Sequence, residues 1–207
     1  MARDADIAKR AFDIIFSYTV LVFGFPLFLI LGLIVKLSSK GPVLFKQVRI
    51  GEKKKPFVFY KFRTMYMNNN HDLHKEYVKE LITSNKKAGN AYKIEKDPRV
   101  TPIGRFLRRT SLDELPQFFN VLKGDMSVIG PRPPIPYELR YYKDWHFQRL
   151  ETKPGITGLW QVSGRTLLPF DEMVRLDIEY NKKRSFALDL YILIKTIPAI
   201  IAGKGAY

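Results

Sequence analysis

Cysteine is absent from this sequence of 207 residues, which excludes disulfides and thiolate metal sites and permits a reducing cytoplasmic setting. The phosphate-binding P-loop motif is also missing, and no glycine-rich dinucleotide motif follows a strand. His71 and His74 have ligand-like spacing, but without cysteine or a third clustered ligand they predict no zinc site. Helix-turn-helix and zinc-finger signatures are absent as well.

Acidic residues are scarce, because 20 Asp and Glu stand against 35 Lys and Arg, for a net charge of +15. Such an excess indicates an anionic partner, whether nucleic acid, anionic lipid or phosphorylated substrates. Hydrophobic residues still make up 46 % of the chain, so it is not a disordered polycation. Its length suits one domain with a real core and an attachment.

One long stretch carries no charge at all, from Ile14 to Val35. As a straight helix it would reach about 33 Å, enough to cross a bilayer. Pro26 follows Gly24 by two residues and predicts a kink there, because proline removes a helical hydrogen bond. Each of the two arms would then be too short to cross alone. Basic residues flank both ends, which suits two ends on the cytoplasmic face. On these features a spanning helix and a re-entrant hairpin are equally open.

The rest of the chain predicts a small hairpin followed by helices. Alternating residues favour strands at 43–51 and 56–65, joined by the turn sequence GEKKK. Helices are expected at 71–82, 137–150, 170–181 and 187–202, and extended chain at 153–165. We therefore expect a domain with a small hairpin and several helices at a membrane surface.

A carboxylate pair, Asp113-Glu114, stands out just after a run of arginines. Ser111 and Glu114 fit a capping box, in which the two acids only start a helix. Against that, an aspartate beside arginines can act as a nucleophile toward phosphorus, and a neighbouring glutamate can hold Mg²⁺ on the same phosphates. The residues alone leave both interpretations open.

Basic side chains in stiff surroundings are candidates for binding phosphate. Arg132 lies between prolines in GPRPP, and Arg165 and Lys61 are similar candidates. Taken singly, each could equally be a solvated charge. Asp177, on an apolar helix, is expected either to pair with an arginine across the core or to lie on the surface.

Three stretches resemble the bacterial sugar transferase family, the monotopic polyprenyl-phosphate phosphoglycosyl transferases. They are YKFRTM at 60–65, DPRVTPIGRFLRRTSLDELPQFFNVLKGDMSVIGPRP at 97–133 and KPGITGLWQVSGR at 153–165. The resemblance covers the chain from about Lys9 to its C-terminus. The GLWQVSGRT stretch and the C-terminal residues look more like transferases that place hexose-1-phosphates for exopolysaccharide or O-antigen. Those commonly carry an additional N-terminal membrane region and a further domain, neither of which is expected here.

The resemblance implies that a sugar-1-phosphate passes from a UDP-sugar to polyprenyl (undecaprenyl) phosphate, with release of UMP. It implies a covalent phosphosugar on Asp113 and Mg²⁺ held by Glu114. Further roles toward phosphates or nucleotide fall on the positions matching Lys61, Arg108, Arg132 and Arg165, and Asp177 matches a polar residue of the site.

The same resemblance implies a compact α+β fold with interfacial amphipathic helices and a re-entrant N-terminal helix broken at Gly24 and Pro26. Residues 1–40 would form that membrane helix and 41–207 the catalytic domain, on the cytoplasmic face of the bacterial inner membrane. Membrane lipid would be a partner and nucleic acid would not, while the sugar and a homodimer are left open. Two weaker hypotheses are a non-catalytic basic protein that binds the membrane surface and a membrane-tethered nucleic-acid binder.

Overall fold

The computed structural model describes residues 2–67, 72–85, 97–164 and 168–201. Its helices are α1 (Ala2–Phe23), α2 (Phe25–Ser38), α3 (Asp72–Ser84), α4 (Pro102–Arg109), α5 (Gln117–Lys123), α6 (Leu159–Ser163), α7 (Phe170–Lys183) and α8 (Phe186–Ile201). Its strands are β1 (Leu44–Ile50), β2 (Pro56–Phe62), β3 (Ser127–Ile129) and β4 (Gly155–Thr157). Four 3₁₀ turns complete it: η1 (Glu52–Lys54), η2 (Leu112–Glu114), η3 (Pro136–Tyr141) and η4 (Asp144–Leu150).

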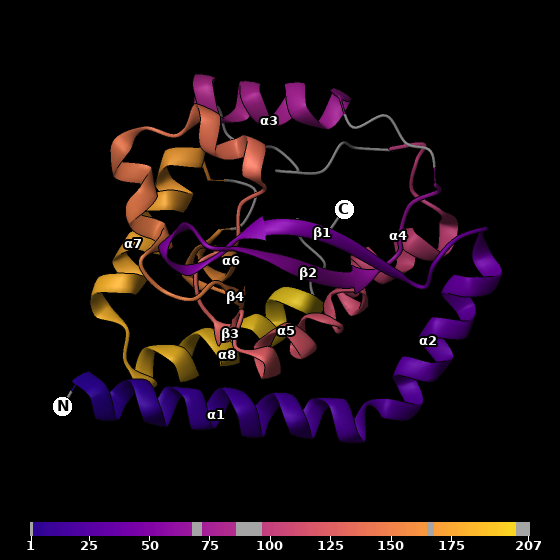
Figure 1. Cartoon of the computed structure of the whole chain (residues 1–207), viewed down its shortest axis with the longest axis horizontal. Helices are drawn as coiled ribbons and strands as arrows, with labels where there is room; N and C mark the ends of the chain where they lie inside the picture. The colour runs from indigo at the N-terminus through magenta and orange to yellow at the C-terminus, as the bar shows by residue number, and fades with distance from the viewer. Residues whose placement is uncertain (1, 68–71, 86–96, 165–167, 202–207) are drawn as a thin grey trace.

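Two small sheets lie among the helices, so the expected α+β class is confirmed. β1 and β2 form the predicted antiparallel hairpin, with Val48 opposite Val58, and it crosses the front of the molecule in Figure 1. β3 and β4 pair in parallel. Under the hairpin, apolar side chains of β2, α5, β3 and α8 pack together; they include Phe59, Val121, Ile129 and Ile192.

Two of the expected elements are wrong. The helix predicted at 137–150 is two 3₁₀ turns, η3 and η4, separated by extended backbone at Tyr142 and Lys143. The break allows the buried His146 ring to accept a hydrogen bond from the Lys143 N–H. The stretch 153–165 is extended only as far as Thr157. Beyond Gly158 it forms α6, because this turn buries Trp160 in the core beside α7.

The kink expected near Gly24 is confirmed, since α1 and α2 meet there at a bend of 64°. Pro26 lies in the first turn of α2, where its missing N–H costs nothing. A side chain at Gly24 would bring its Cβ to 2.4 Å from the Val20 carbonyl oxygen. Among the described helices none is by itself long and apolar enough to cross a membrane, and only the bent α1–α2 pair meets the length and composition for it.

Polar side chains of α1 point into the domain. Asp13 is buried and accepts hydrogen bonds from the Ser127 hydroxyl at 3.0 Å and the Val128 N–H at 2.9 Å. Arg10 donates to the last carbonyls of α5, and Lys9 pairs with Asp189 of α8 at 2.7 Å. These bonds orient α1 so that its apolar side faces outward.

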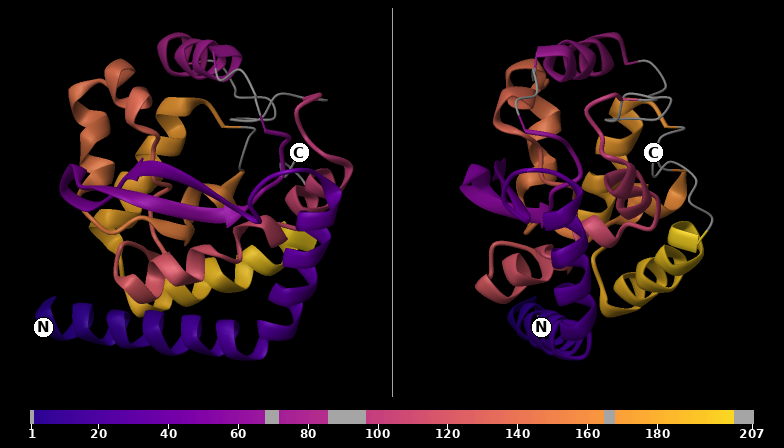
Figure 2. Two further views of the ribbon diagram at one scale, coloured as in Figure 1. Left: turned by 45° about the vertical axis from the view of Figure 1, so that its right-hand side comes forward. Right: turned by 90° about the vertical axis from the view of Figure 1, so that its right-hand side faces the viewer.

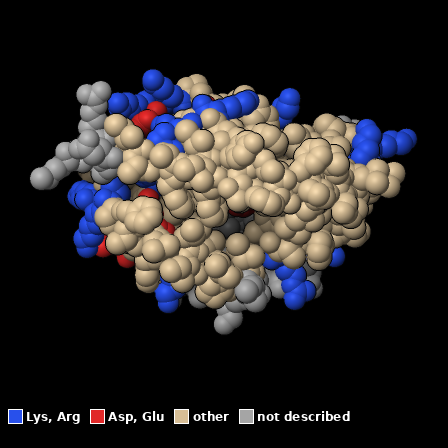
Figure 3. Space-filling view, turned by 90° about the horizontal axis from the view of Figure 1, so that it is seen from below, with Lys and Arg blue, Asp and Glu red and all other residues tan. Residues whose placement is uncertain are grey.

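The outward sides of α1, α2 and α8 are apolar, and we call these three sides together the apolar face. α1 and α8 meet near the start of α8, where the rings of Phe12 and Phe186 are in contact, and α8 then runs away from α1 in Figures 1 and 2. Figure 3 looks at the molecule from below and shows a broad surface without charges, with Lys and Arg at its edge. Its exposed large residues are Ile7, Ile14, Ile15, Tyr18, Val22, Phe23, Phe25, Leu27, Leu29, Ile30, Leu33, Ile34, Leu37, Phe186, Leu190, Tyr191, Ile194 and Ile197.

We predict that Asp13→Ala weakens the attachment of α1. The change leaves the buried Ser127 hydroxyl and Val128 N–H without their acceptor, which costs about 2 kcal/mol of unfolding free energy. For a chain of this size the midpoint of thermal unfolding, measured in detergent, should fall by about 4 to 8 °C. The control is Asp6→Ala, which removes an exposed pair with Arg184 and should change the midpoint little. Equal midpoints for the two variants would contradict this role of Asp13.

Candidate active site

The carboxylate pair lies on the short turn η2, between the end of α4 and the start of α5. Ser111, just before it, has a left-handed backbone (φ 57°, ψ 16°) and its side chain caps nothing. The capping-box prediction is therefore wrong, because a capping serine needs an extended backbone from which its oxygen can reach the following N–H groups. Instead, the left-handed residue turns the chain sharply between α4 and η2. Such backbone costs of order 1 kcal/mol and gathers at functional sites.

Asp113 is 5 % exposed and lies in the field of Arg108, which is itself 9 % exposed. Burial lowers the pKa of the Arg108 guanidinium, and attraction to Asp113 and Asp97 opposes that fall. The Nε of Arg108 donates to the Thr64 hydroxyl at 2.9 Å. Glu114 is only partly buried. The turn thus combines a buried carboxylate beside a fixed cation with a second carboxylate nearer to solvent.

Gly104 explains how α4 comes close enough to build this arrangement. A Cβ on Gly104 would lie 2.0 Å from the Thr64 carbonyl oxygen, so only glycine allows the helix to rest on the chain that leaves β2. Thr101 begins α4 and accepts the Gly104 N–H at 2.8 Å. These contacts place Arg108, one turn further on, against Thr64.

Asp97 also belongs to this site. It is almost fully buried and pairs with Arg99 at 2.7 Å. Burial favours a raised pKa for Asp97, but the hydrogen bonds and charge of Arg99 outweigh it and hold the pKa below its usual value. Asp97 is consequently a second buried anion near Arg108. Its Asp-Pro-Arg sequence is typical of a turn and does not reveal that role.

Lys61 lies on β2, which packs against η2, and is half-buried with its ammonium 5.4 Å from the centre of the Phe45 ring. Asn120 of α5 fixes this strand: its side-chain oxygen accepts the Tyr60 N–H, and its amide donates to the Val58 carbonyl. Asn120 is fully buried and was missed by sequence reasoning. Arg63, two residues after Lys61, instead donates to carbonyls at the end of α2.

Arg132 and Asp177 meet in a second cluster. Asp177 is fully buried, is hydrogen-bonded to Arg149, and lies near the backbone N–H of Arg132. Burial raises its pKa to about 6, against the opposing attraction of Arg149 and Arg132. The expected pairing with an arginine across the core is confirmed, and the surface alternative is wrong.

The remaining predicted residues are Gly24, Pro26 and Arg165. Arg165 lies outside the described residues, and Gly24 and Pro26 lie at the helix bend.

The side chains of the site can be compared with the ligands that Mg²⁺ requires. In the described ranges no group of three or more His, Cys, Asp or Glu side chains could hold a metal ion. Mg²⁺, however, is commonly held by one or two carboxylates together with substrate phosphates. Asp113 and Glu114 fit that mode, because they are adjacent and Glu114 is partly exposed.

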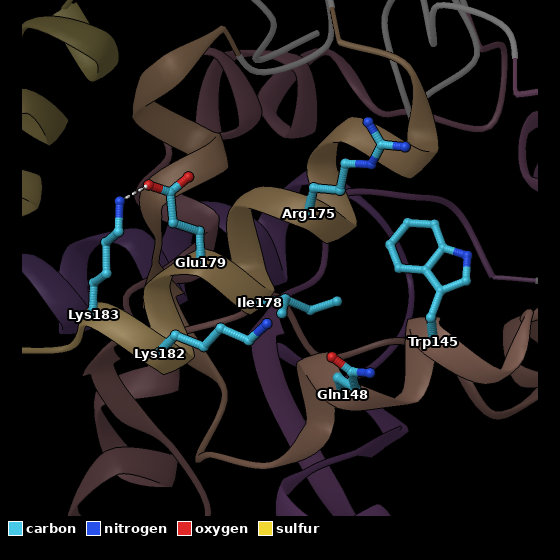
Figure 4. Close-up of a pocket in the computed structure, with 7 residues that line it drawn as sticks. All are labelled: Trp145, Gln148, Arg175, Ile178, Glu179, Lys182 and Lys183. Atoms are coloured by element: carbon cyan, nitrogen blue, oxygen red, sulfur yellow. Dashed lines mark hydrogen bonds and ion pairs between the residues drawn. The ribbon is translucent and has the colours of Figure 1, made fainter.

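A surface hollow lies elsewhere, between η4 and α7, as Figure 4 shows. Trp145, Arg175 and Lys182 are among the side chains that line it. None of the predicted site residues belongs to its lining. The candidate site is therefore defined by the two buried charge clusters and not by this hollow.

Comparison with known proteins connects these residues to one family. The family model described as bacterial sugar transferase matches residues 4–203. The chain is 43 % identical over 209 residues to the undecaprenyl-phosphate galactose phosphotransferase of Salmonella typhimurium, covering 99 % of this chain and 43 % of the relative. It is 40 % identical over 205 residues to the exopolysaccharide production protein ExoY of Rhizobium meliloti, covering 97 % and 88 %.

A third relative is the UDP-glucose:undecaprenyl-phosphate glucose-1-phosphate transferase of Klebsiella pneumoniae, 40 % identical over 209 residues, which cover 97 % of this chain and 42 % of the relative. The chain thus spans less than half the length of the galactose and glucose transferases, and most of ExoY.

We predict that Gly104→Ala displaces α4 and thereby disrupts the candidate site. The new Cβ would overlap the Thr64 backbone and push α4 away, which separates Arg108 from Thr64 and costs about 2 to 3 kcal/mol of unfolding free energy. Thermal unfolding in detergent measures the loss. Gly32→Ala in α2 is the matched control, since its Cβ meets only the Val43 side chain at 3.6 Å and alanine favours the helix. A Gly104→Ala midpoint equal to that of Gly32→Ala would show that α4 does not need this glycine.

Proposed function

The chain belongs to the bacterial sugar transferase family, and on that premise we propose that it transfers the sugar-1-phosphate of a UDP-sugar to polyprenyl phosphate. The acceptor and donor classes are those that the names of the Salmonella and Klebsiella relatives state for those proteins. Transfer of this kind would begin the assembly of a polysaccharide on its lipid carrier.

The observation that carries the proposal is the buried Asp113 beside Arg108, next to a more exposed Glu114. A carboxylate oxygen of Asp113 would attack the phosphorus that bears the sugar. The bond from that phosphorus to the UMP oxygen would break, leaving a phosphosugar on Asp113 while UMP departs with the bonding electrons. An oxygen of polyprenyl phosphate would then attack the same phosphorus and release the Asp113 carboxylate.

Burial suits this intermediate, because an aspartyl phosphate would be lost to hydrolysis in a site open to water. Arg108 would draw the phosphate oxygens toward Asp113 and stabilise the charge that builds up on them. Lys61 and Arg132 would bind further phosphate oxygens of the donor. Mg²⁺, held by Glu114, would when bound neutralise part of the pyrophosphate charge.

The apolar face supports a place at the membrane for this chemistry. Its exposed side chains come from α1, α2 and α8, and it is edged by Lys and Arg, which favour anionic lipid headgroups. We assign residues 1–40 to a re-entrant membrane helix and 41–207 to a catalytic domain on the cytoplasmic face. The bonds of Lys9, Arg10 and Asp13 would hold that helix rigidly to the domain, so the site keeps a constant height above the lipid.

A non-catalytic membrane-binding protein is the competing function. It requires Asp113 and Glu114 to serve only as a helix start, and the uncapped, left-handed Ser111 removes the capping box on which that interpretation rested. Lipid binding with no UMP formed from any UDP-sugar would favour this competitor.

Asp113→Asn should abolish transfer while leaving the fold intact. With a panel of UDP-sugars, polyprenyl phosphate and Mg²⁺, we expect UMP release to fall about a thousandfold or more, because the amide is a poor nucleophile. Mass spectrometry of the wild-type chain with donor alone should find the phosphosugar adduct, and the variant should lack it. Asp144→Asn, at an exposed aspartate of η4, is the control and should retain full activity. Substantial turnover by Asp113→Asn would refute the covalent mechanism.

Glu114→Gln should weaken the response to magnesium. Chelation of Mg²⁺ should stop UMP release by the wild-type chain, and the variant should need about tenfold more Mg²⁺ for half-maximal release, because one charged ligand is lost. Glu179→Gln, at a partly exposed carboxylate of α7 paired with Lys183, should leave the Mg²⁺ requirement unchanged. An unchanged requirement in Glu114→Gln would remove this residue from the metal site.

A further inference from the structure

Glu138 is a buried carboxylate that the proposed chemistry does not use. It lies in η3, just after the GPRPP loop, and is fully buried. Neither of its carboxylate oxygens accepts a hydrogen bond from the residues that the structure describes. Burying a charge without such bonds is costly, so a carboxylate in this position calls for an explanation. Its one ion pair within that part of the chain is with Arg132, whose Nη1 lies 3.9 Å from a Glu138 oxygen.

The backbone of the GPRPP loop, residues 130–134, is held on every side. Its bonds are Gly130 N–H to Thr157 O, Gly155 N–H to Pro131 O, Arg49 Nη1 to Pro133 O and Ile50 N–H to Pro134 O, each at 2.9 to 3.0 Å. The Arg132 N–H lies near the buried Asp177. Because proline has no N–H to donate, Gly130 and Arg132 supply all the backbone donors of the loop, and the Gly130 N–H is bonded to Thr157. The hydrogen-bonded backbone of the loop therefore fixes the position from which the Arg132 side chain extends.

Arg132 is the arginine of this cluster that reaches the surface. Arg149 and Arg49 are both buried, and they bind Asp177 and the Pro133 carbonyl respectively. The Arg132 side chain is 22 % exposed. An anion arriving from solvent would therefore meet Arg132 first.

The separation of 3.9 Å between Arg132 and Glu138 is too long for a hydrogen bond, yet short enough for strong attraction inside a protein. The carboxylate of such a pair can orient the guanidinium by charge attraction alone. The N–H groups of the guanidinium then remain available to another anion. A guanidinium has five N–H donors in a fixed fork that matches phosphate oxygens.

We propose that Glu138 is a positioning residue that holds Arg132 in the orientation in which it binds the phosphates of a nucleoside diphosphate. The proposal rests on the proposed function, since it takes the donor to be a nucleotide sugar. It deepens that function by naming the residue that makes Arg132 an effective phosphate ligand. Glu138 itself touches no substrate.

The test is a double-mutant cycle on the full chain in detergent, with UDP binding measured by calorimetry. Glu138→Gln and Arg132→Gln should each weaken UDP binding about tenfold, and the double variant should bind no more weakly than Arg132→Gln alone. A role of Glu138 in the fold alone predicts independent effects, about a hundredfold in the double variant. Unchanged binding by Glu138→Gln, or independent effects, would overturn the proposal. Glu179→Gln is the matched control and should bind UDP as the wild-type chain does.

Thermal unfolding supplies a readout that needs no ligand. Arg132→Gln leaves Glu138 buried without its cation and should lower the unfolding midpoint by about 5 °C or more, while the double variant should recover most of that loss. A double variant less stable than Arg132→Gln would contradict the pairing. Should Glu138→Gln fail to fold, Glu138→Asp is the second variant; it keeps the charge but shortens the side chain. Unaltered UDP binding by Glu138→Asp would then count against positioning.

Kinetics separate this proposal from the proposed function. Glu138→Gln should raise the KM for the UDP-sugar about tenfold and leave the KM for polyprenyl phosphate within about twofold. If the wild-type chain releases no UMP from any UDP-sugar, the proposed function fails, whereas the binding and unfolding cycles still decide the role of Glu138. A wild-type chain that binds neither UDP nor inorganic pyrophosphate would overturn the role of Glu138 as well.

Discussion

The burial of Arg108 beside Asp113 is the interaction on which the candidate site depends. An aspartate kept from water needs a fixed cation, and Arg108 is fixed because its Nε binds Thr64. That bond in turn requires α4 to rest directly on the chain after β2, which only Gly104 allows. The left-handed Ser111 then turns the chain so that η2 begins four residues after Arg108. Removing any one of these features would separate the carboxylate from its cation.

Some of the acidic residues of this basic chain are buried, whereas Lys and Arg lie on its surface at the edge of the apolar face. Of the 20 acidic residues, Asp13, Asp97, Asp113, Glu138, Asp177 and Asp189 are buried. Several of them hold arginines or helices in place. Lys and Arg remain at the edge of the apolar face. The excess of Lys and Arg produces a positive field that attracts anions, while the buried acids orient arginines inside the domain.

The residue types of the site could be predicted from sequence, but their partners could not. Asp113 and Glu114 were candidates because they follow a run of arginines, and the family resemblance implied their roles. Asp97 instead resembled an ordinary turn residue and Asn120 an ordinary helix residue. Both gain their roles from contacts across the fold: Asp97 lies near Arg108, and Asn120 binds the backbone of β2. The capping box failed for a similar reason. Its spacing was correct, but packing of α4 places Ser111 in a backbone region where it cannot cap.

The sequence by itself determined the hairpin, the long helices, the break near Gly24 and the family, because alternation, helical periodicity, proline chemistry and long motifs are local or linear signals. Only the tertiary structure decided which charges meet. Glu138 with Arg132, Asp177 with Arg149 and Asp13 with Val128 join residues that are 6, 28 and 115 positions apart. Such pairs follow from how layers pack, and no local pattern encodes that packing.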